Sequence, residues 1–166
     1  MRDTSGFDEF YRGTSVRVLR YGYAVAGDLS EAQDLVQEAY ARAWRHWGKV
    51  AGHPDPEAWV RLVIARLAND RWRRLGRWRS VLQRTGRPEP APPPNEDSVM
   101  LLAALRRLPI QHRRAIALHY LFDMSVADIA EETGVPLGTV KSWLSRGRAG
   151  LATALTGSPA EECTDE

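Results

Sequence analysis

Apolar side chains recur every three to four residues along most of this chain, which is the spacing of amphipathic helices. The first segment with this spacing covers residues 7–26, and the Gly-Asp pair that follows is expected to end it. Ser30, with Gln33 three residues later, has the pattern of a capping box and predicts a helix over residues 31–47. No segment shows the strict alternation of a strand, so the pattern predicts an all-α protein.

A polar loop is expected at residues 48–54, and a third helix begins after it. Asp55 is suited to be the N-cap of that helix. Pro56 is suited to be its first residue, because the first helical N–H has no partner in any case. Residues 61–87 contain nine arginines and a single acid, Asp70, so this helix becomes strongly basic toward its end.

Half of the chain's ten prolines lie within residues 84–94. Proline-rich segments favour extended tethers, and about fifteen such residues reach roughly 45 Å. The composition therefore predicts two small helical domains, residues 1–79 and 96–156, joined by a flexible linker at residues 80–95. Residues 157–166, which include four acids and the lone cysteine, are expected to be a disordered acidic tail.

Two helices are expected at the start of the second domain. Asn95 is suited to cap one that runs through Leu108, and Pro109 to open another that ends near Leu121. Their apolar stripes supply the residues expected to be buried, which are Leu101, Leu102, Leu105, Leu108, Ile116 and Leu118.

A helix-turn-helix pattern follows. Ser125 is expected to cap a helix ending at Thr133, Gly134 to make the turn, and residues 136–155 to form the last helix. Such a motif needs a small buried residue where the helices touch, and apolar positions that dock the second helix. Ala130 suits the first need, and the docking positions are Val135, Val140 and Leu144.

The start of the last helix carries small polar and basic side chains, which are Thr139, Lys141, Ser142, Ser145, Arg146 and Arg148. In helix-turn-helix motifs, residues at this place enter the major groove while basic residues hold phosphates. The lysine and the two arginines are therefore candidates for phosphates, and the threonine and serines for base edges. A hairpin that binds nothing would explain the same spacing, but a merely solvated helix usually carries more Glu and Lys.

Five of the six tryptophans lie in the first domain, close to the arginines. Aromatic rings beside Arg suit single-stranded nucleic acid, because bases stack on the rings. Trp44 and Trp59 fall on apolar stripes and are expected in the core, whereas Trp47, Trp72 and Trp78 are less obviously buried. Arginines also suit a helix C-terminus, yet nine against one acid exceeds that need and favours a nucleic-acid surface.

Several classes of protein find no support in the sequence. The single cysteine, Cys163, cannot form an internal disulfide, the four histidines show no zinc-binding spacing, and no phosphate loop or nucleophile motif is present. We therefore expect that the protein is not an enzyme and that it binds neither a metal nor a cofactor. No stretch approaches the ~20 apolar residues of a membrane span, and no apolar run follows Arg2 and Asp3. A soluble, cytoplasmic protein without a signal peptide is expected.

Several motifs together resemble one family in order and spacing. Leu35-Val-Gln-Glu-Ala39 with Trp44 resembles the second-region helix of extracytoplasmic-function sigma factors, and residues 59–71 resemble the helix after it. Leu108-Pro109 with Arg113, Arg114 and Tyr120 looks like the start of their fourth region. Asp128-Ile-Ala-Glu131 and Gly138-Thr-Val-Lys-Ser142 look like its helix-turn-helix. The resemblance covers about residues 7–152 and is greatest to a small actinobacterial group named after sigma-E.

This resemblance implies partners and site residues. The first domain would bind the β′ clamp helices of core RNA polymerase through Asp34, Leu35, Gln37 and Glu38. It would recognise and melt the minus-10 promoter element with Trp47, Asn69, Arg71, Arg73 and Arg74, and residues 48–55 would lie near a flipped base. The second domain would touch the β flap and read minus-35 DNA with the six polar residues named above. Whether an anti-sigma factor holds the protein inactive is left open.

Two positions depart from the family pattern. Trp143 stands where members usually carry Arg, and Gly147 where Ala is usual, at a cost of about 1 kcal/mol in mid-helix. Together they imply weaker or altered reading of minus-35 DNA. Two rival functions remain at this point. A stand-alone repressor or activator explains the helix-turn-helix but not the first domain, and a helical adaptor would bind polymerase without reading DNA.

Overall fold

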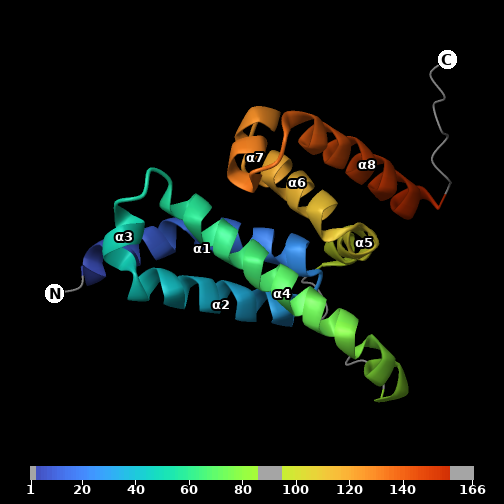
Figure 1. Ribbon diagram of the computed structural model, residues 1–166, viewed down its shortest axis with the longest axis horizontal. Helices are drawn as coiled ribbons and strands as arrows, with labels where there is room; N and C mark the ends of the chain where they lie inside the picture. The colour runs from blue at the N-terminus through green and yellow to red at the C-terminus, as the bar shows by residue number, and fades with distance from the viewer. Residues whose placement is uncertain (1–2, 86–94, 158–166) are drawn as a thin grey trace. The chain divides into compact units, whose positions relative to one another are not determined.

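The computed structural model describes residues 3–85 and 95–157, and every regular element within these ranges is an α-helix (Figure 1). The all-α prediction is therefore confirmed for this part of the chain. The chain divides into two compact units, Met1–Pro92 and Pro93–Glu166. The first unit contains α1 (Thr4–Ala26), α2 (Leu29–Arg45), α3 (Trp47–Ala51) and α4 (Pro56–Thr85). The second contains α5 (Glu96–Arg106), α6 (Ile110–Leu121), α7 (Val126–Thr133) and α8 (Leu137–Thr156).

Helices α1, α2 and α4 pack against one another to form the core of the first unit. The turn between α1 and α2 uses Gly27, whose φ of 76° is a left-handed conformation that suits glycine. The capping-box prediction for Ser30 is wrong, because Asp28 is the N-cap and its Oδ2 accepts a hydrogen bond from the Glu31 amide at 3.2 Å. Ser30 already lies inside the first turn and is exposed.

The segment expected as a loop at residues 48–54 includes the short helix α3. Trp47 begins this helix and is only 7% exposed, contrary to the expectation of a less buried ring. Its indole packs 5.3 Å from the ring of Phe7 and 5.2 Å from that of Phe10, measured between centroids. These partners come from α1, more than thirty residues earlier in the sequence, so the local pattern did not show them.

The predicted start of α4 is confirmed. The Asp55 Oδ1 atom accepts a hydrogen bond from the Ala58 amide at 3.0 Å, and Pro56 is the first helical residue. The helix continues to Thr85, six residues into the segment expected as linker, and among residues 56–75 the last buried side chain is that of Ala68. Residues 86–94, the rest of the expected linker apart from Asn95, lie outside the described residues, as do 158–166 of the expected tail, Cys163 included.

The second unit begins with α5 and α6, whose predicted starts are confirmed. The carbonyl oxygen of Asn95 accepts from the Val99 amide at 3.0 Å, and Pro109 occupies the N-cap of α6. The expected burial is confirmed for five of the six apolar residues, which are Leu102, Leu105, Leu108, Ile116 and Leu118. The prediction that Leu101 is buried is wrong, because its side chain is 47% exposed. Successive side chains on a helix are rotated by about 100°, so Leu101 points away from the buried stripe that contains Leu102.

Helices α7 and α8 form the predicted helix-turn-helix. The Ser125 Oγ atom accepts from the Asp128 amide at 3.1 Å, and Gly134 makes the turn with φ at 72°. Val140 and Leu144 dock α8 as expected, with 0% and 2% exposure. Ala130 is only half-buried, so it is not the buried small residue that was predicted where the two helices touch. The side chain that α7 fully buries is that of Ile129.

Two glycines on α8 lie where an added methyl group would crowd neighbouring side chains of the second unit. A methyl group on Gly147 of α8 would lie 3.0 Å from Cγ1 of Ile116 in α6, and one on Gly150 would collide with Leu108. The glycine that departs from the family pattern therefore has a packing reason, which the sequence alone did not show.

Candidate partner and nucleic-acid interfaces

The polar face of α2 lies on the surface of the first unit. Asp34 and Gln37 are exposed, and the Glu38 side chain keeps 40% of its accessible surface. Leu35 does not belong to this face, because its side chain is fully buried in the core of the unit. A direct contact between Leu35 and a partner is therefore excluded in this conformation, and the residue acts by fixing the position of α2.

Glu38 is surrounded by positive charge. Its Oε1 atom accepts from Arg42 Nε at 2.8 Å and lies 3.7 Å from an Arg45 nitrogen. The pKa of Glu38 is lowered, first by the hydrogen bond from Arg42 and further by the charges of Arg42, Arg45 and Arg71. The carboxylate is thus held ionised within a mixed-charge patch.

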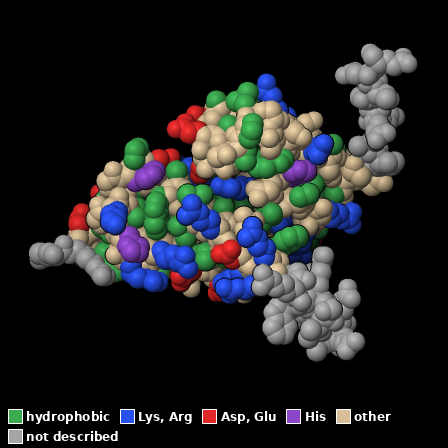
Figure 2. Space-filling model, in the orientation of Figure 1, with side chains coloured by type: hydrophobic (Ala, Val, Ile, Leu, Met, Phe, Trp, Pro, Cys, Tyr) green, Lys and Arg blue, Asp and Glu red, His purple; other side chains and the backbone are tan. Residues whose placement is uncertain are grey.

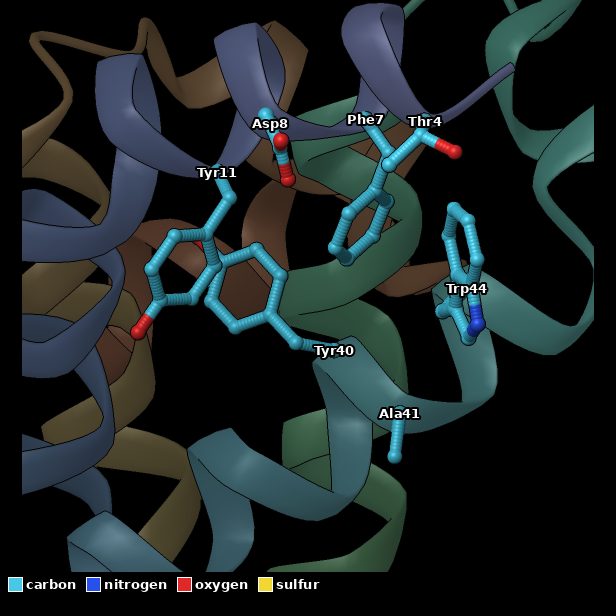
Figure 3. Close-up of a pocket in the computed structure, with 7 residues that line it drawn as sticks. All are labelled: Thr4, Phe7, Asp8, Tyr11, Tyr40, Ala41 and Trp44. Atoms are coloured by element: carbon cyan, nitrogen blue, oxygen red, sulfur yellow. The ribbon is translucent and has the colours of Figure 1, made fainter. Parts of the chain in front are cut away.

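The same side of α2 continues into an open aromatic groove, shown in Figure 3. Its volume is about 390 Å³, and it is lined by Thr4, Phe7, Asp8, Tyr11, Tyr40, Ala41 and Trp44. The ring of Phe7 lies 5.1 Å from that of Trp44, and Tyr11 meets Tyr40 edge-on at 4.8 Å. Residues 34, 37, 38, 41 and 44 follow helical i, i+3, i+4 spacing, so the polar face and the groove form one surface.

Tyr40 closes the inner end of this groove. Its hydroxyl lies 2.7 Å from the Thr14 hydroxyl of α1, and burial raises the pKa of Tyr40 to about 12. The phenol is therefore neutral at ordinary pH. Reasoning from the sequence missed the groove, although Phe7, Tyr11, Tyr40 and Trp44 are spaced as aromatic pairs one helical turn apart.

The five residues predicted to meet minus-10 DNA do not form one cluster. Arg73 and Arg74 are exposed, Asn69 and Arg71 are half-buried, and Trp47 lies in the core away from α4's outer surface. The indole nitrogen of Trp47 is buried and has no hydrogen-bond partner among the described residues. Asn69 and Arg73 are one helical turn apart and lie on one side of α4, whereas Arg71 and Arg74, also one turn apart, lie on another. The exposed aromatic ring beside them is Trp72, at 58%.

Acidic side chains are interspersed with the basic ones on the first unit. Figure 2 shows Lys and Arg side chains scattered among Asp and Glu on the face of this unit turned to the viewer. On α4, the exposed residues Trp72, Arg73 and Arg74 follow one another in the chain. That combination of cations and an exposed ring suits a nucleic-acid backbone with unstacked bases.

An ionic network fixes the loop that precedes α4. Arg61 is 4% exposed, and its terminal nitrogens lie 3.5 Å from Asp55 Oδ2 and 3.9 Å from Glu57 Oε1. Arg17 of α1 donates to both Glu57 oxygens, at 2.7 and 2.6 Å. His53 Nδ1 lies within hydrogen-bond distance of the backbone of Asp55. Asp55 is therefore held to α4 by Arg61, and α4 is held to α1 through Glu57 and Arg17, a support that the sequence analysis did not identify.

The six polar residues of α8 all lie on its outer side. Lys141, Ser145, Arg146 and Arg148 are exposed, and Thr139 and Ser142 are half-buried. Trp143, which departs from the family pattern, is also half-buried. Arg146 lies near His112 of α6, whose pKa is lowered by burial and then by the Arg146 charge. This side of α8 therefore offers cations and short hydroxyl side chains along three turns of one helix.

Two findings limit the classes of site in the described part of the chain. No helix within residues 3–85 and 95–157 is both long and apolar enough to cross a membrane. In the same ranges, no three His, Cys, Asp or Glu side chains gather as a metal site would require.

Comparison with known families identifies both units. Residues 10–78 match the family model described as Sigma-70 region 2, and residues 98–151 match that of Sigma-70, region 4. These ranges contain the α2 face, residues 56–78 of α4 and residues 126–151 of the helix-turn-helix. The order of the two matches is that of the two compact units.

Individual proteins give the same result. The chain is 35% identical over 133 residues to the ECF RNA polymerase sigma factor SigL of Mycobacterium tuberculosis, covering 75% of each chain. It is 29% identical over 151 residues to the RNA polymerase sigma-E factor of Streptomyces antibioticus, covering 90% and 84%. A similar solved structure is the sigma factor RpoE in complex with the anti-sigma factor NepR from Bartonella quintana. Its TM-score is 0.69 at 24% identity, with 89% and 96% coverage, which establishes the fold.

Proposed function

Since the chain belongs to the extracytoplasmic-function (ECF) RNA polymerase sigma factors, we propose that its two units divide the reading of a promoter between them. The protein is a transcription initiation factor that binds core RNA polymerase and directs it to promoter DNA. The observation that carries the division is the pair of separate units, each matching one promoter-reading region and each with its own exposed cationic helix. This activity places the protein with the polymerase in the cytoplasm.

The polymerase face, in this proposal, consists of Asp34, Gln37 and Glu38 together with the aromatic groove. It would bind the β′ clamp helices. The polar residues supply hydrogen bonds and charge, while the rings of Phe7 and Trp44 offer apolar surface beside them. An interface with an apolar centre and a polar rim is the usual arrangement of stable protein contacts. Leu35 supports this face from the core.

The minus-10 contacts are assigned to the outer turns of α4. Arg73 and Arg74 would hold the phosphates of the melted strand, and Asn69 and Arg71 would lie beside them. Residues 48–55, of which Asp55 is held by Arg61, would form the wall near the flipped base. Trp47 supports this wall indirectly, because its buried ring fixes α3 just before the loop.

The minus-35 contacts are assigned to α8. Thr139, Ser142 and Ser145 would face base edges in the major groove, and the lysine and arginines would face phosphates. The same unit would touch the β flap. A regulatory partner of the anti-sigma class is compatible with this family but is not assigned to any surface.

The test combines a pull-down of core RNA polymerase with run-off transcription from the promoter of the protein's own gene. Reversing the charge at Asp34 and Glu38 (D34K with E38K) should reduce recovery of core, whereas D97K on α5 is the control with the same kind of charge change on the other unit. Unchanged recovery of core with the double variant would show that the polymerase face is wrong.

A second pair of variants tests the basic helix. R73A with R74A should reduce open-complex formation and its dependence on salt, because each lost phosphate contact on a single strand lowers the salt slope by about 0.7. R12A removes one exposed arginine from α1 and serves as the control. Tight duplex binding without core would favour a stand-alone regulator, and core binding without any DNA crosslink at α4 would favour an adaptor.

A further inference from the structure

Tyr120 and Arg148 form a paired side-chain unit on the surface of the second unit. Arg148 of α8 donates from Nε to the Tyr120 hydroxyl at 2.8 Å, and Tyr120 belongs to the last turn of α6. The guanidinium carbon lies 5.8 Å from the centre of the Tyr120 ring, within the range of a cation–π contact. Two interactions thus fix one arginine against one tyrosine.

The pair remains accessible although its members contact each other. Tyr120 is 57% exposed, and Arg148 is exposed as well. More than half of the Tyr120 surface is therefore open to contact with another molecule. The neighbouring His119 stabilises the ring, since its own ring lies 4.9 Å from that of Tyr120 and its Nδ1 is 2.9 Å from the Met124 carbonyl oxygen.

The hydrogen-bond directions leave donors available. Because Arg148 uses Nε for Tyr120, its two terminal NH₂ groups still carry four N–H donors. The tyrosine oxygen accepts in this bond, so its own O–H is free to donate to another acceptor. An acceptor placed between them would meet a charge-assisted N–H and an O–H at once, which suits a phosphate group.

The position along α8 also favours phosphate over bases. Arg148 lies eleven residues after the first residue of the helix, which is roughly 16 Å along its axis. Base edges are read by the N-terminal residues of a recognition helix, and residues farther along meet the DNA backbone. Arg148 is also braced by a different helix, α6, so its guanidinium is held in place before DNA arrives.

We propose that Tyr120 and Arg148 act as one preorganised phosphate clamp that contacts the DNA backbone beside the minus-35 element. The proposal rests on the assignment of the second unit to minus-35 DNA and adds Tyr120 as a contact residue. The clamp fixes the position of α8 on the duplex without reading sequence. The other explanation, a bond that only joins α6 to α8, predicts an effect on stability and none on DNA.

The experiment uses the full chain bound to core polymerase, with Y120F, R148A and the double variant. Y120F keeps the ring but removes the hydroxyl. Promoter binding is measured by fluorescence anisotropy at several salt concentrations, on a promoter with its native minus-35 element and on one with that element scrambled. Thermal unfolding of each variant is recorded in parallel.

The clamp predicts a loss of about five- to tenfold in affinity for each single variant, equal on the native and scrambled promoters because phosphates carry no sequence. R148A should also lower the salt slope by about 0.9. The double variant should lose little more than R148A alone, since the two groups act as one.

Additive losses, or unchanged DNA binding with a lower unfolding temperature, would overturn the clamp and leave the proposed function intact. A wild-type complex without preference for the native promoter would overturn the proposed function and the clamp with it.

Discussion

Three glycines on α8 provide a graded test of how closely this helix is packed. Replacing glycine by alanine inside a helix gains about 1 kcal/mol from backbone entropy, if the methyl group has room. Gly138, in the first turn, has no atom within 4 Å of the added methyl group. Gly147 would bring it to 3.0 Å from Cγ1 and 3.2 Å from Cδ1 of Ile116, and Gly150 would drive it into Leu108.

The expected changes in unfolding free energy follow from these distances. G138A should stabilise the second unit by up to about 1 kcal/mol. In G147A the same gain is offset by the displacement of Ile116, which leaves a net change within about 1 kcal/mol of zero. In G150A the end of the buried Leu108 side chain must shift, and overpacking costs about 1–3 kcal/mol, so after the gain of about 1 kcal/mol a net loss of up to about 2 kcal/mol is expected.

The assay is thermal unfolding together with amide hydrogen exchange of peptides from α6 and α8. Peptides from α2 in the other unit serve as the internal control, because their exchange should not change. A free-energy difference of 1 kcal/mol corresponds to about 4–8 °C in a domain of this size. If G150A proves as stable as the wild type while G138A does not gain, the close packing of α8 against Leu108 is not what requires glycine.

Two further predictions concern the first unit. R17A should lower the unfolding free energy of this unit by less than about 1 kcal/mol, because Arg17 is largely solvated. E57Q should cost more, because the buried Arg61 also loses an anion. Urea unfolding compares the two variants, and equal costs would refute this role of Arg61. The pKa of Tyr40 is raised to about 12 by burial, so the folded state holds its proton more tightly than the unfolded state does at about 10. Stability from this phenol should be present below pH 10 and fall by about 3 kcal/mol as the pH rises to about 12. Alkaline unfolding of the wild type and Y40F measures the difference, and identical pH profiles would contradict the assignment.

Local chemistry in the sequence predicted most helix ends correctly. Asp55 with Pro56, Ser125 and Gly134 all act as expected, because a cap or a left-handed turn is determined within three or four residues. The prediction of Ser30 as the N-cap is wrong because a second residue nearby competes for the same role. Asp28 is also a good N-cap residue, and its extended backbone starts the helix two residues earlier.

Burial by distant residues could not be predicted in the same way. The burial of Trp47 and the shape of the aromatic groove depend on the ring of Phe7, which contacts Trp44 and Trp47 and lies far from both in the sequence. Leu35 appears in a motif of functional residues, yet helical spacing already places it with Ala32 and Ala39 on the inner side. Reading the motif by faces instead of by order would have separated Leu35 from Asp34.

The two sides of α8 differ in how freely their residues can change over time. On the inner side, Val140, Leu144 and Gly147 fill spaces whose limits are set by α6 and α7, so few substitutions there preserve the fold. On the outer side, Lys141, Ser145 and Arg146 are exposed, and their replacement costs the domain little. Of these three, only Ser145 is proposed to face base edges, so we expect that selection can alter the preferred DNA sequence there without a loss of stability. A gene duplicate of this protein could acquire a new set of promoters through changes at a few surface positions while its scaffold stays the same.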